Sequence, residues 1–181
     1  MVEAPSIETV RTLRKQLGAR ILKTPVMRCA RLEERVGRDT SVLGKLEFLQ
    51  HTGTFKARGA LAVVSSLDAK QREAGVTAVS AGNHAIATAF AARAAGTTAK
   101  IVMISTANAA RIQACRDYGA ELVMVDDVHE AFEVAEAIQR DEGRFFVHPF
   151  EGKAVATGTG AVGLEICEQC DSFDSVIVPV G

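Results

Sequence analysis

The chain has 181 residues, of which 48% are hydrophobic, and this length and composition favour one full globular core or slightly more. Its 21 basic and 22 acidic residues leave a net charge of -1, which disfavours nucleic acid and anionic membrane as partners. No apolar run is long enough for a spanning helix, and the opening Met-Val-Glu-Ala-Pro lacks the features of a signal peptide. Four cysteines are too sparse for a disulfide scaffold, so we expect a cytoplasmic protein.

The first 75 residues predict an irregular lead-in to the rest of the chain. Apolar residues at helical spacing, and stop signals such as Thr24-Pro25, favour short helices joined by turns. The expected helices cover residues 6–17, 31–36 and 55–67, and a short strand covers residues 42–47.

From Val76 onward, short apolar runs alternate with segments of helical spacing, a pattern typical of parallel strands joined by crossover helices. The sequence therefore predicts an α/β fold of open parallel sheets with helices on both faces. The expected strands cover residues 76–80, 99–104, 121–125, 144–148 and 175–180. The expected helices cover residues 84–95, 108–118 and 128–138, the last with one buried face of Val128, Ala131, Phe132, Ala135 and Ile138.

These elements group into two predicted units. Residues 51–149 form a smaller α/β domain, and residues 1–50 together with 150–181 form part of a larger, incomplete one. The last residues, Asp174 to Gly181, have the pattern of a buried parallel strand that runs into a glycine turn. Because open α/β sheets bind ligands just beyond the carboxyl ends of their strands, the chain ends where a binding loop should begin. We expect an N-terminal part of a longer protein, or a sheet completed by another chain.

Lys56 lies in an unusual place for a lysine. Gly53 permits a sharp turn and Thr54 can cap the next helix, which puts Lys56 in its first turn. The positive end of the helix dipole disfavours a protonated amine there, and a neutral lysine amine attacks carbonyl carbons. The pattern fits a Schiff-base lysine. The simpler alternative, an exposed Lys56 and Arg58 on an amphipathic helix, is the more frequent one on physical grounds alone.

A second candidate is the segment from Ser80 to His84, where a strand end, a glycine turn and a helix start follow one another. Free backbone amides at a helix N-terminus bind carboxylate or phosphate groups. The side-chain amide of Asn83 can hold a phenolic or hydroxyl oxygen. An ordinary turn capped by Asn83 is equally compatible with this pattern.

The segment Gly158-Thr159-Gly160-Ala161-Val162-Gly163 matches the dinucleotide-binding fingerprint, but no apolar strand precedes it. We therefore predict a tight, closely packed loop that leads into a helix over residues 164–170.

The remaining cysteine and histidine patterns predict structure rather than metal binding. Cys167 and Cys170 have metal-ligand spacing without a second pair nearby, so we expect structural thiols. No metal site is predicted, because no ligand spacing is shared by His51, His129 and His148.

Together, these motifs resemble those of the fold-type II pyridoxal-phosphate enzymes, whose fold is like that of the tryptophan synthase β-subunit. The closest resemblance is to the branch of serine and threonine dehydratases (ammonia-lyases) and serine racemases, and it runs from about Leu22 to Gly181. Four segments carry this resemblance, and they follow one another in the same order as in the family: Thr52 to Ala60, Ser80 to His84, Tyr118-Gly119-Ala120-Glu121 and His148-Pro149-Phe150.

The resemblance implies a role for each matching residue. The lysine of the family's Ser/Thr-Phe-Lys-x-Arg-Gly segment forms the Schiff base with pyridoxal 5'-phosphate, which implies that Lys56 is catalytic and that Phe55 packs against the cofactor ring. Asn83 would hydrogen-bond the phenolic oxygen of the cofactor. Gly181 is also assigned to cofactor binding, before the glycine-rich phosphate loop that would follow it in the larger cofactor domain. The substrate carboxylate would be held by Ser80, Ala81, Gly82, Asn83 and His84.

The implied reaction is β-elimination from a hydroxy amino acid such as L-serine or L-threonine. The substrate amine displaces Lys56 from the cofactor, Lys56 takes the α-proton, and loss of the hydroxyl leads to a 2-oxo acid and ammonia. Racemases of this branch carry a second serine where this chain has Ala81, which favours a dehydratase. Ala57 follows the lysine where the sulfhydrylase and threonine synthase branches have an acid, which ranks those reactions lower.

Two alternatives remain open: an amino-acid racemase of the same branch, and a truncated, non-catalytic α/β module without the phosphate loop. The expected partners are a small amino-acid substrate and further copies of the chain, since members of the family form dimers. Neither nucleic acid nor a membrane is expected.

Overall fold

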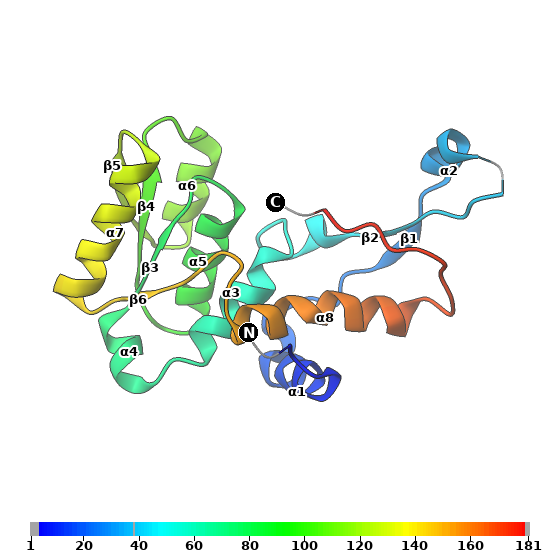
Figure 1. Cartoon of the computed structure of the whole chain (residues 1–181), viewed down its shortest axis with the longest axis horizontal. Helices are drawn as coiled ribbons and strands as arrows, with labels where there is room; N and C mark the ends of the chain where they lie inside the picture. Colours follow the sequence, from blue (N-terminus) through cyan, green and yellow to red (C-terminus); the bar gives the residue numbers. More distant parts are fainter. Residues whose placement is uncertain (1–3, 38, 180–181) are drawn as a thin grey trace.

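The computed structural model describes residues 4–37 and 39–179. Figure 1 shows a four-stranded sheet with its helices at one end of the molecule and a two-stranded ribbon with α2 at the other. In chain order the elements are α1 (Ile7–Leu17), η1 (Gly18–Arg20), β1 (Val26–Arg28), α2 (Ala30–Val36), β2 (Leu43–Lys45), η2 (Glu47–Leu49), α3 (Lys56–Ser65), α4 (Ala69–Ala74), β3 (Val76–Val79), α5 (Asn83–Ala94), β4 (Ala99–Ile104), α6 (Ala109–Asp117), β5 (Glu121–Val125), α7 (Val128–Glu142), β6 (Phe145–Phe146) and α8 (Lys153–Gln169).

The four-stranded sheet is parallel throughout, with the strand order β5-β4-β3-β6. The chain steps outward from β3 to β4 and β5, and α7 then carries it back to β6 on the other side of β3. The direction of winding therefore reverses between β3 and β6. In open α/β sheets, ligands bind beyond the carboxyl ends of the strands at such a switch point. The loops that follow β3 and β6 are accordingly the expected walls of a site.

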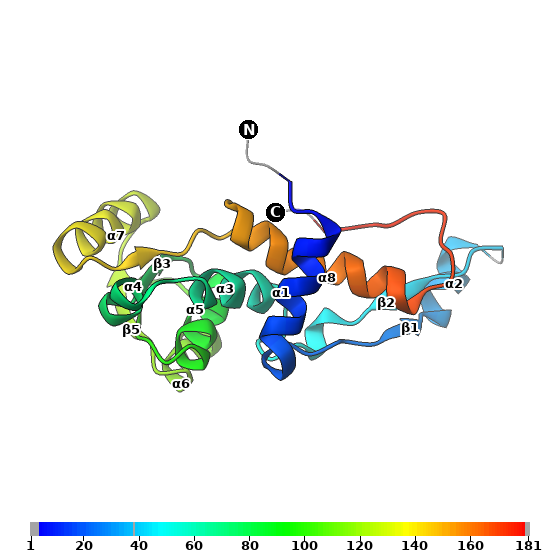
Figure 2. The same cartoon turned by 90° about the horizontal axis from the view of Figure 1, so that it is seen from below.

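Helices cover both faces of this sheet, which confirms the predicted fold class. Successive strand residues point to opposite faces, and Ile101 and Met103 lie in one buried cluster with α5 while Val102 lies in another with α7. Figure 2 shows α7 and α6 on opposite sides of the sheet. No helix of the described residues is long and apolar enough to span a membrane.

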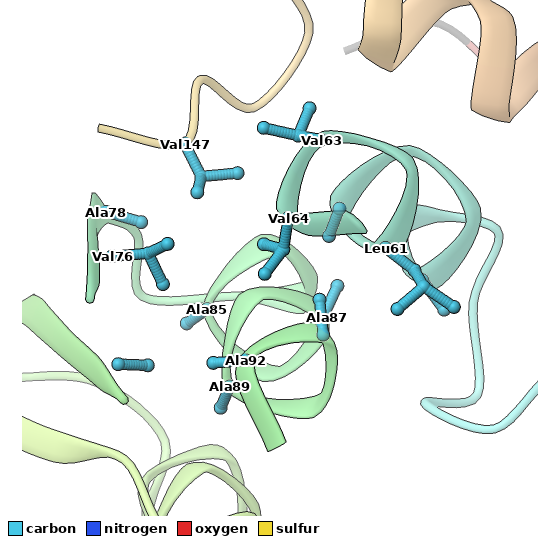
Figure 3. Packing of buried hydrophobic residues seen from close by; sticks show 14 of the residues in the cluster. Leu61, Val63, Val64, Val76, Ala78, Ala85, Ala87, Ala89, Ala92 and Val147 are labelled. Carbon is cyan, nitrogen blue, oxygen red and sulfur yellow. The ribbon is translucent and has the colours of Figure 1, made fainter. Parts of the chain in front are cut away.

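The alanine-rich helix α5 packs between the sheet and α3. Ala85, Ala89 and Ala92 are almost completely buried, and their small side chains permit close approach of the neighbouring elements. Figure 3 shows these residues beside Val76 of β3 and Val64 of α3. Since α3 also packs against α8, the helix that begins at Lys56 lies in contact with both α5 and α8.

Most of the expected elements are present, with boundaries shifted by a few residues, but two local predictions are wrong. The expected helix over 55–67 ends two residues early, at Ser65. A further helix, α4, was not predicted, although a capping box between Asp68 and Gln71 marks its start. Val128 and Phe132 of α7 are about half exposed. The buried face of this helix is therefore narrower than the predicted one and consists of Ala131, Ala135 and Ile138. The division into a domain of 51–149 and one of 1–50 plus 150–181 stays a prediction.

Two predictions near the end of the chain are also wrong. The glycines at 158–163 lie within α8, which begins at Lys153, so they form a helix and not a loop. The expected strand at 175–180 is not formed by residues 175–179, which run irregularly and leave Ile177 96% exposed. A strand needs a neighbour for its backbone hydrogen bonds, and this segment has none within the described residues.

Candidate active site

Lys56 is the first residue of α3, and its half-buried side chain points toward the loop after β6. Its Nζ donates a hydrogen bond to the carbonyl oxygen of Pro149 at 2.9 Å, and it lies 5.2 Å from the centre of the Phe55 ring. No carboxylate of residues 4–37 or 39–179 pairs with this amine. The predicted cap is wrong, because Phe55 occupies the N-cap position and Thr54 makes no capping hydrogen bond.

The loop after β3 contains the residues predicted to hold a carboxylate. Ser80 Oγ accepts a hydrogen bond from the backbone N–H of Gly82 at 3.1 Å, which closes the turn. Gly82, not Asn83, is the N-cap of α5, and the exposed Asn83 is its first helical residue. The first amides of a helix have no acceptor within the helix, so the N-terminus of α5 presents donors and a positive dipole to this loop.

His84 differs from the rest of this loop because its ring points into the core. The residue is 5% exposed, and Nε2 lies 2.8 Å from the carbonyl oxygen of Val147. Burial lowers the pKa of His84 to about 4, and the positive charges of Lys56 and His148 act in the same direction. The ring is therefore neutral near pH 7, and only the backbone N–H of His84 is left to face a carboxylate.

The two motifs converge at the sheet's switch point. His84 contacts Val147 and Lys56 contacts Pro149, so both reach the same short segment after β6. The sequence predicted each motif separately, and the structure brings them together where an α/β sheet places its ligands.

Further contacts hold the segment that precedes Lys56. The hydroxyl of Tyr118 donates to the carbonyl oxygen of His51 at 3.0 Å. The His51 ring stacks on Phe90 at 5.3 Å between ring centres. Thr54 Oγ1 is buried and has no hydrogen-bond partner within the described part of the chain. A polar atom left unpaired beside Lys56 is a position for a polar ligand group.

A buried ionic cluster lies behind Lys56. Arg58, which is 0% exposed, binds Glu47 through Nε and Nη2 at 2.8 Å and Glu165 through Nη1 and Nη2 at 2.9 Å. Lys45 binds Glu165 at 2.6 Å and also donates to the carbonyl oxygen of Thr24. Two positive and two negative groups thus join α3, α8 and β2. Sequence analysis missed this cluster, whose only signal was charged residues within otherwise apolar segments.

Arg111 was also missed. It lies in the first turn of α6, and its Nη1 approaches the carbonyl oxygen of Ala81 at 3.4 Å. This exposed guanidinium adds positive charge beside the loop predicted to hold a carboxylate. A single arginine near a helix start gave no signal in the sequence.

Other features lie away from this site. A cavity of about 460 Å³ between α1 and α8 is lined by several charged residues that already form ion pairs, among them Arg14, Lys23 and Glu168. Cys167 is an exposed free thiol and Cys170 a partly buried one. Within the described residues, no group of three or more His, Cys, Asp or Glu side chains is arranged to hold a metal ion. Gly181 lies outside those residues.

Comparison with known sequences identifies relatives for nearly the whole chain. Residues 18–181 match the family model described as pyridoxal-phosphate dependent enzyme. The chain is 48% identical to phenylserine dehydratase of Ralstonia pickettii, over 98% of this chain and 54% of that protein. It is 37% identical to L-threonine ammonia-lyase of Thermotoga maritima, over 97% of this chain and 44% of the relative. The chain thus spans about half the length of these curated relatives.

Solved structures with the same fold include two from the expected branch. Maize serine racemase matches with a TM-score of 0.87 and 32% identity, over 93% of this chain and 51% of the other. The T.th. threonine deaminase matches with a TM-score of 0.82 and 34% identity, over 91% and 52% of the respective chains. These matches confirm the predicted fold-type II architecture.

Proposed function

The chain belongs to the family of pyridoxal-phosphate dependent enzymes, and we propose that it carries the reactive lysine and the substrate-carboxylate loop of a hydroxy amino acid dehydratase. The reaction would convert a substrate such as L-serine or L-threonine to a 2-oxo acid and ammonia. The observation that carries this proposal is the meeting of the Lys56 amine and the N-terminal end of α5 at the switch point between β3 and β6.

The residues around Lys56 fit pyridoxal 5'-phosphate. The amine has no carboxylate partner among the described residues, so an ion pair need not be broken before it reacts with an aldehyde. The Phe55 ring provides an apolar face beside it, and the unpaired Thr54 Oγ1 offers a hydrogen-bonding group. An amine, an aromatic face and a free hydroxyl form a suitable cradle for a polar aromatic aldehyde.

Each role follows from the placement of a residue of this chain. When bound, the cofactor supplies an electron sink for the charge left at the substrate's α-carbon. Lys56 Nζ would hold the cofactor and would accept the α-proton of the substrate. The Ser80–Gly82 turn and the first amides of α5 bind the substrate carboxylate, with the His84 backbone among them. The Asn83 amide would donate to the phenolic oxygen of the cofactor.

The named relatives support a hydroxy amino acid as the substrate. A phenylserine dehydratase and a threonine ammonia-lyase are both similar to nearly the whole chain, so 3-phenylserine joins L-serine and L-threonine as a candidate. Reprotonation on the opposite face of the α-carbon needs a second acid. Ala81, which has no hydroxyl, disfavours the racemase alternative.

The test measures 2-oxo acid and ammonia released from these three amino acids by the longest natural form of the chain with added cofactor. We expect turnover that is lost in Lys56→Ala and retained in the matched control Lys70→Ala, whose side chain is exposed on α4. Equal release by Lys56→Ala would overturn the proposal. Formation of D-serine without 2-oxo acid would indicate the racemase, and failure to bind cofactor would indicate a non-catalytic module.

We further propose that the protein is cytoplasmic, as its sparse cysteines favour, and that it forms a homo-oligomer, as the family resemblance implies. Light scattering on the purified natural form measures its mass in solution, and a monomer at micromolar concentration would contradict the second expectation.

A further inference from the structure

His84 occupies the first turn of α5, next to the turn proposed to bind the substrate carboxylate, yet its ring is buried. Nε2 lies 2.8 Å from the Val147 carbonyl oxygen. Because a carbonyl oxygen can only accept, Nε2 carries the hydrogen and donates it. The same nitrogen lies 3.5 Å from Thr88 Oγ1, one helical turn further along α5. Both contacts involve the same ring nitrogen, and the shorter one, to Val147, is the hydrogen bond that holds the ring.

Val147 connects this ring to the rest of the site. Its side chain is fully buried, and its backbone N–H donates to the carbonyl oxygen of Thr77 in β3 at 2.8 Å. Two residues further on, the Pro149 carbonyl oxygen accepts the hydrogen bond from Lys56 Nζ. One short segment therefore contacts β3, α5 and the lysine of α3.

We propose that His84 is a positioning residue, whose hydrogen bond to Val147 fixes the carboxylate loop relative to the segment on which the Lys56 amine rests. This inference rests on the proposed function of Lys56 and the loop. The ring itself touches neither substrate nor cofactor. It determines how far the first amides of α5 lie from the amine, and a misplacement of about 1 Å in such a pair lowers rates by up to roughly a hundredfold.

The chemistry of the contact explains why a histidine is suited to this place. Removal of the ring leaves the Val147 carbonyl buried and without this donor. Glutamine carries an N–H at a similar distance from the backbone and can replace the donor. Asparagine carries the same amide on a shorter side chain and cannot reach as far, and leucine has no donor.

The experiment compares His84→Leu, His84→Asn and His84→Gln in the longest natural form of the chain. His129→Leu, on the exposed start of α7, is the control for loss of a histidine elsewhere. Three quantities are measured: KM and kcat for the amino acid that the wild type turns over best, the rate at which pyridoxal phosphate forms a borohydride-reducible bond, and the midpoint of thermal unfolding.

We expect His84→Leu and His84→Asn to raise KM roughly tenfold or more and to slow bond formation. His84→Gln should restore both values to within about threefold of the wild type, and His129→Leu should change neither. If all three His84 variants lower the unfolding midpoint but keep wild-type KM and bond formation, the ring is merely structural and the inference is wrong. A reducible bond that persists in Lys56→Ala would instead contradict the proposed function itself.

Discussion

Arg58 Nη1 lies 2.9 Å from Glu165 Oε1, and the two side chains, 0% and 1% exposed, join α3 to α8 two residues from Lys56. Glu47 and Lys45 extend this cluster, and Arg14 Nε lies 3.9 Å from Glu165 Oε1 at its edge. Burial alone would raise the pKa of the Glu165 carboxyl, but hydrogen bonds from Arg58 and Lys45 hold it below its ordinary value. The cluster therefore stays charged, and it orients α3, the helix that begins at Lys56.

Removal of one partner from this cluster should be strongly destabilising. Glu165→Gln leaves Arg58 and Lys45 with an uncompensated buried charge, and we expect a loss of about 3–5 kcal/mol in the free energy of unfolding. Urea denaturation measures it. The matched control is Glu168→Gln on the same helix, where the exposed pairs with Arg14 and Lys23 contribute about 1 kcal/mol or less. Equal losses in the two variants would show that the buried cluster has no special role.

The glycines of α8 allow a second matched comparison. A Cβ at Gly158 would lie 2.5 Å from the Arg58 carbonyl oxygen and 2.6 Å from Ala62 Cβ, so Gly158→Ala must push α3 and α8 apart. We expect a loss of roughly 1–3 kcal/mol. A Cβ at Gly163, in the same helix, has no neighbour within 4 Å, so Gly163→Ala should stabilise by up to about 1 kcal/mol. Thermal unfolding compares the two variants, and a stabilised Gly158→Ala would show that the helices are not in close contact.

His84 makes stability depend on pH. Its pKa is lowered from 6.5 to about 4 in the folded protein, chiefly by burial, so between these values the unfolded chain binds a proton that the folded chain does not. Stability from this group is therefore complete above about pH 6.5 and falls as the pH decreases toward 4, by up to about 3 kcal/mol.

The measurement is the free energy of unfolding in urea at several pH values, for the wild type and for His84→Gln. The variant has no titrating ring, so the difference between the two proteins should change by about 3 kcal/mol across this range. Other groups titrate in both proteins and cancel in the difference. A difference that is constant with pH would contradict the buried, neutral state of His84.

Strands β4 and β5 could be predicted from the sequence, because each is a short run of mostly apolar residues. The runs at 99–104 and 121–125 are observed with the expected boundaries. The segment at 175–179 has the same pattern and does not form a strand, since pairing depends on a neighbour and not on local composition. Gly158 was misread for a related reason: its role comes from the approach of Arg58, a hundred positions earlier, and not from the adjacent glycines.

The candidate site could be predicted as two separate motifs, Lys56 and the loop from Ser80 to His84. Their sequences carry local signals: a lysine in a first turn, and a glycine turn before a helix. The contacts that join them were not predictable. His84 meets Val147 across 63 positions of sequence, and nothing in either segment indicates the other.

The most direct test of the account is to locate the cofactor on the chain. The longest natural form is mixed with pyridoxal phosphate, reduced with borohydride and digested, and mass spectrometry identifies the modified lysine. We predict that the pyridoxyl group is found on the peptide that contains Lys56 and that Lys56→Ala removes it. Modification spread over exposed lysines such as Lys70, or an unchanged level in Lys56→Ala, would contradict the assignment of Lys56 as the reactive amine.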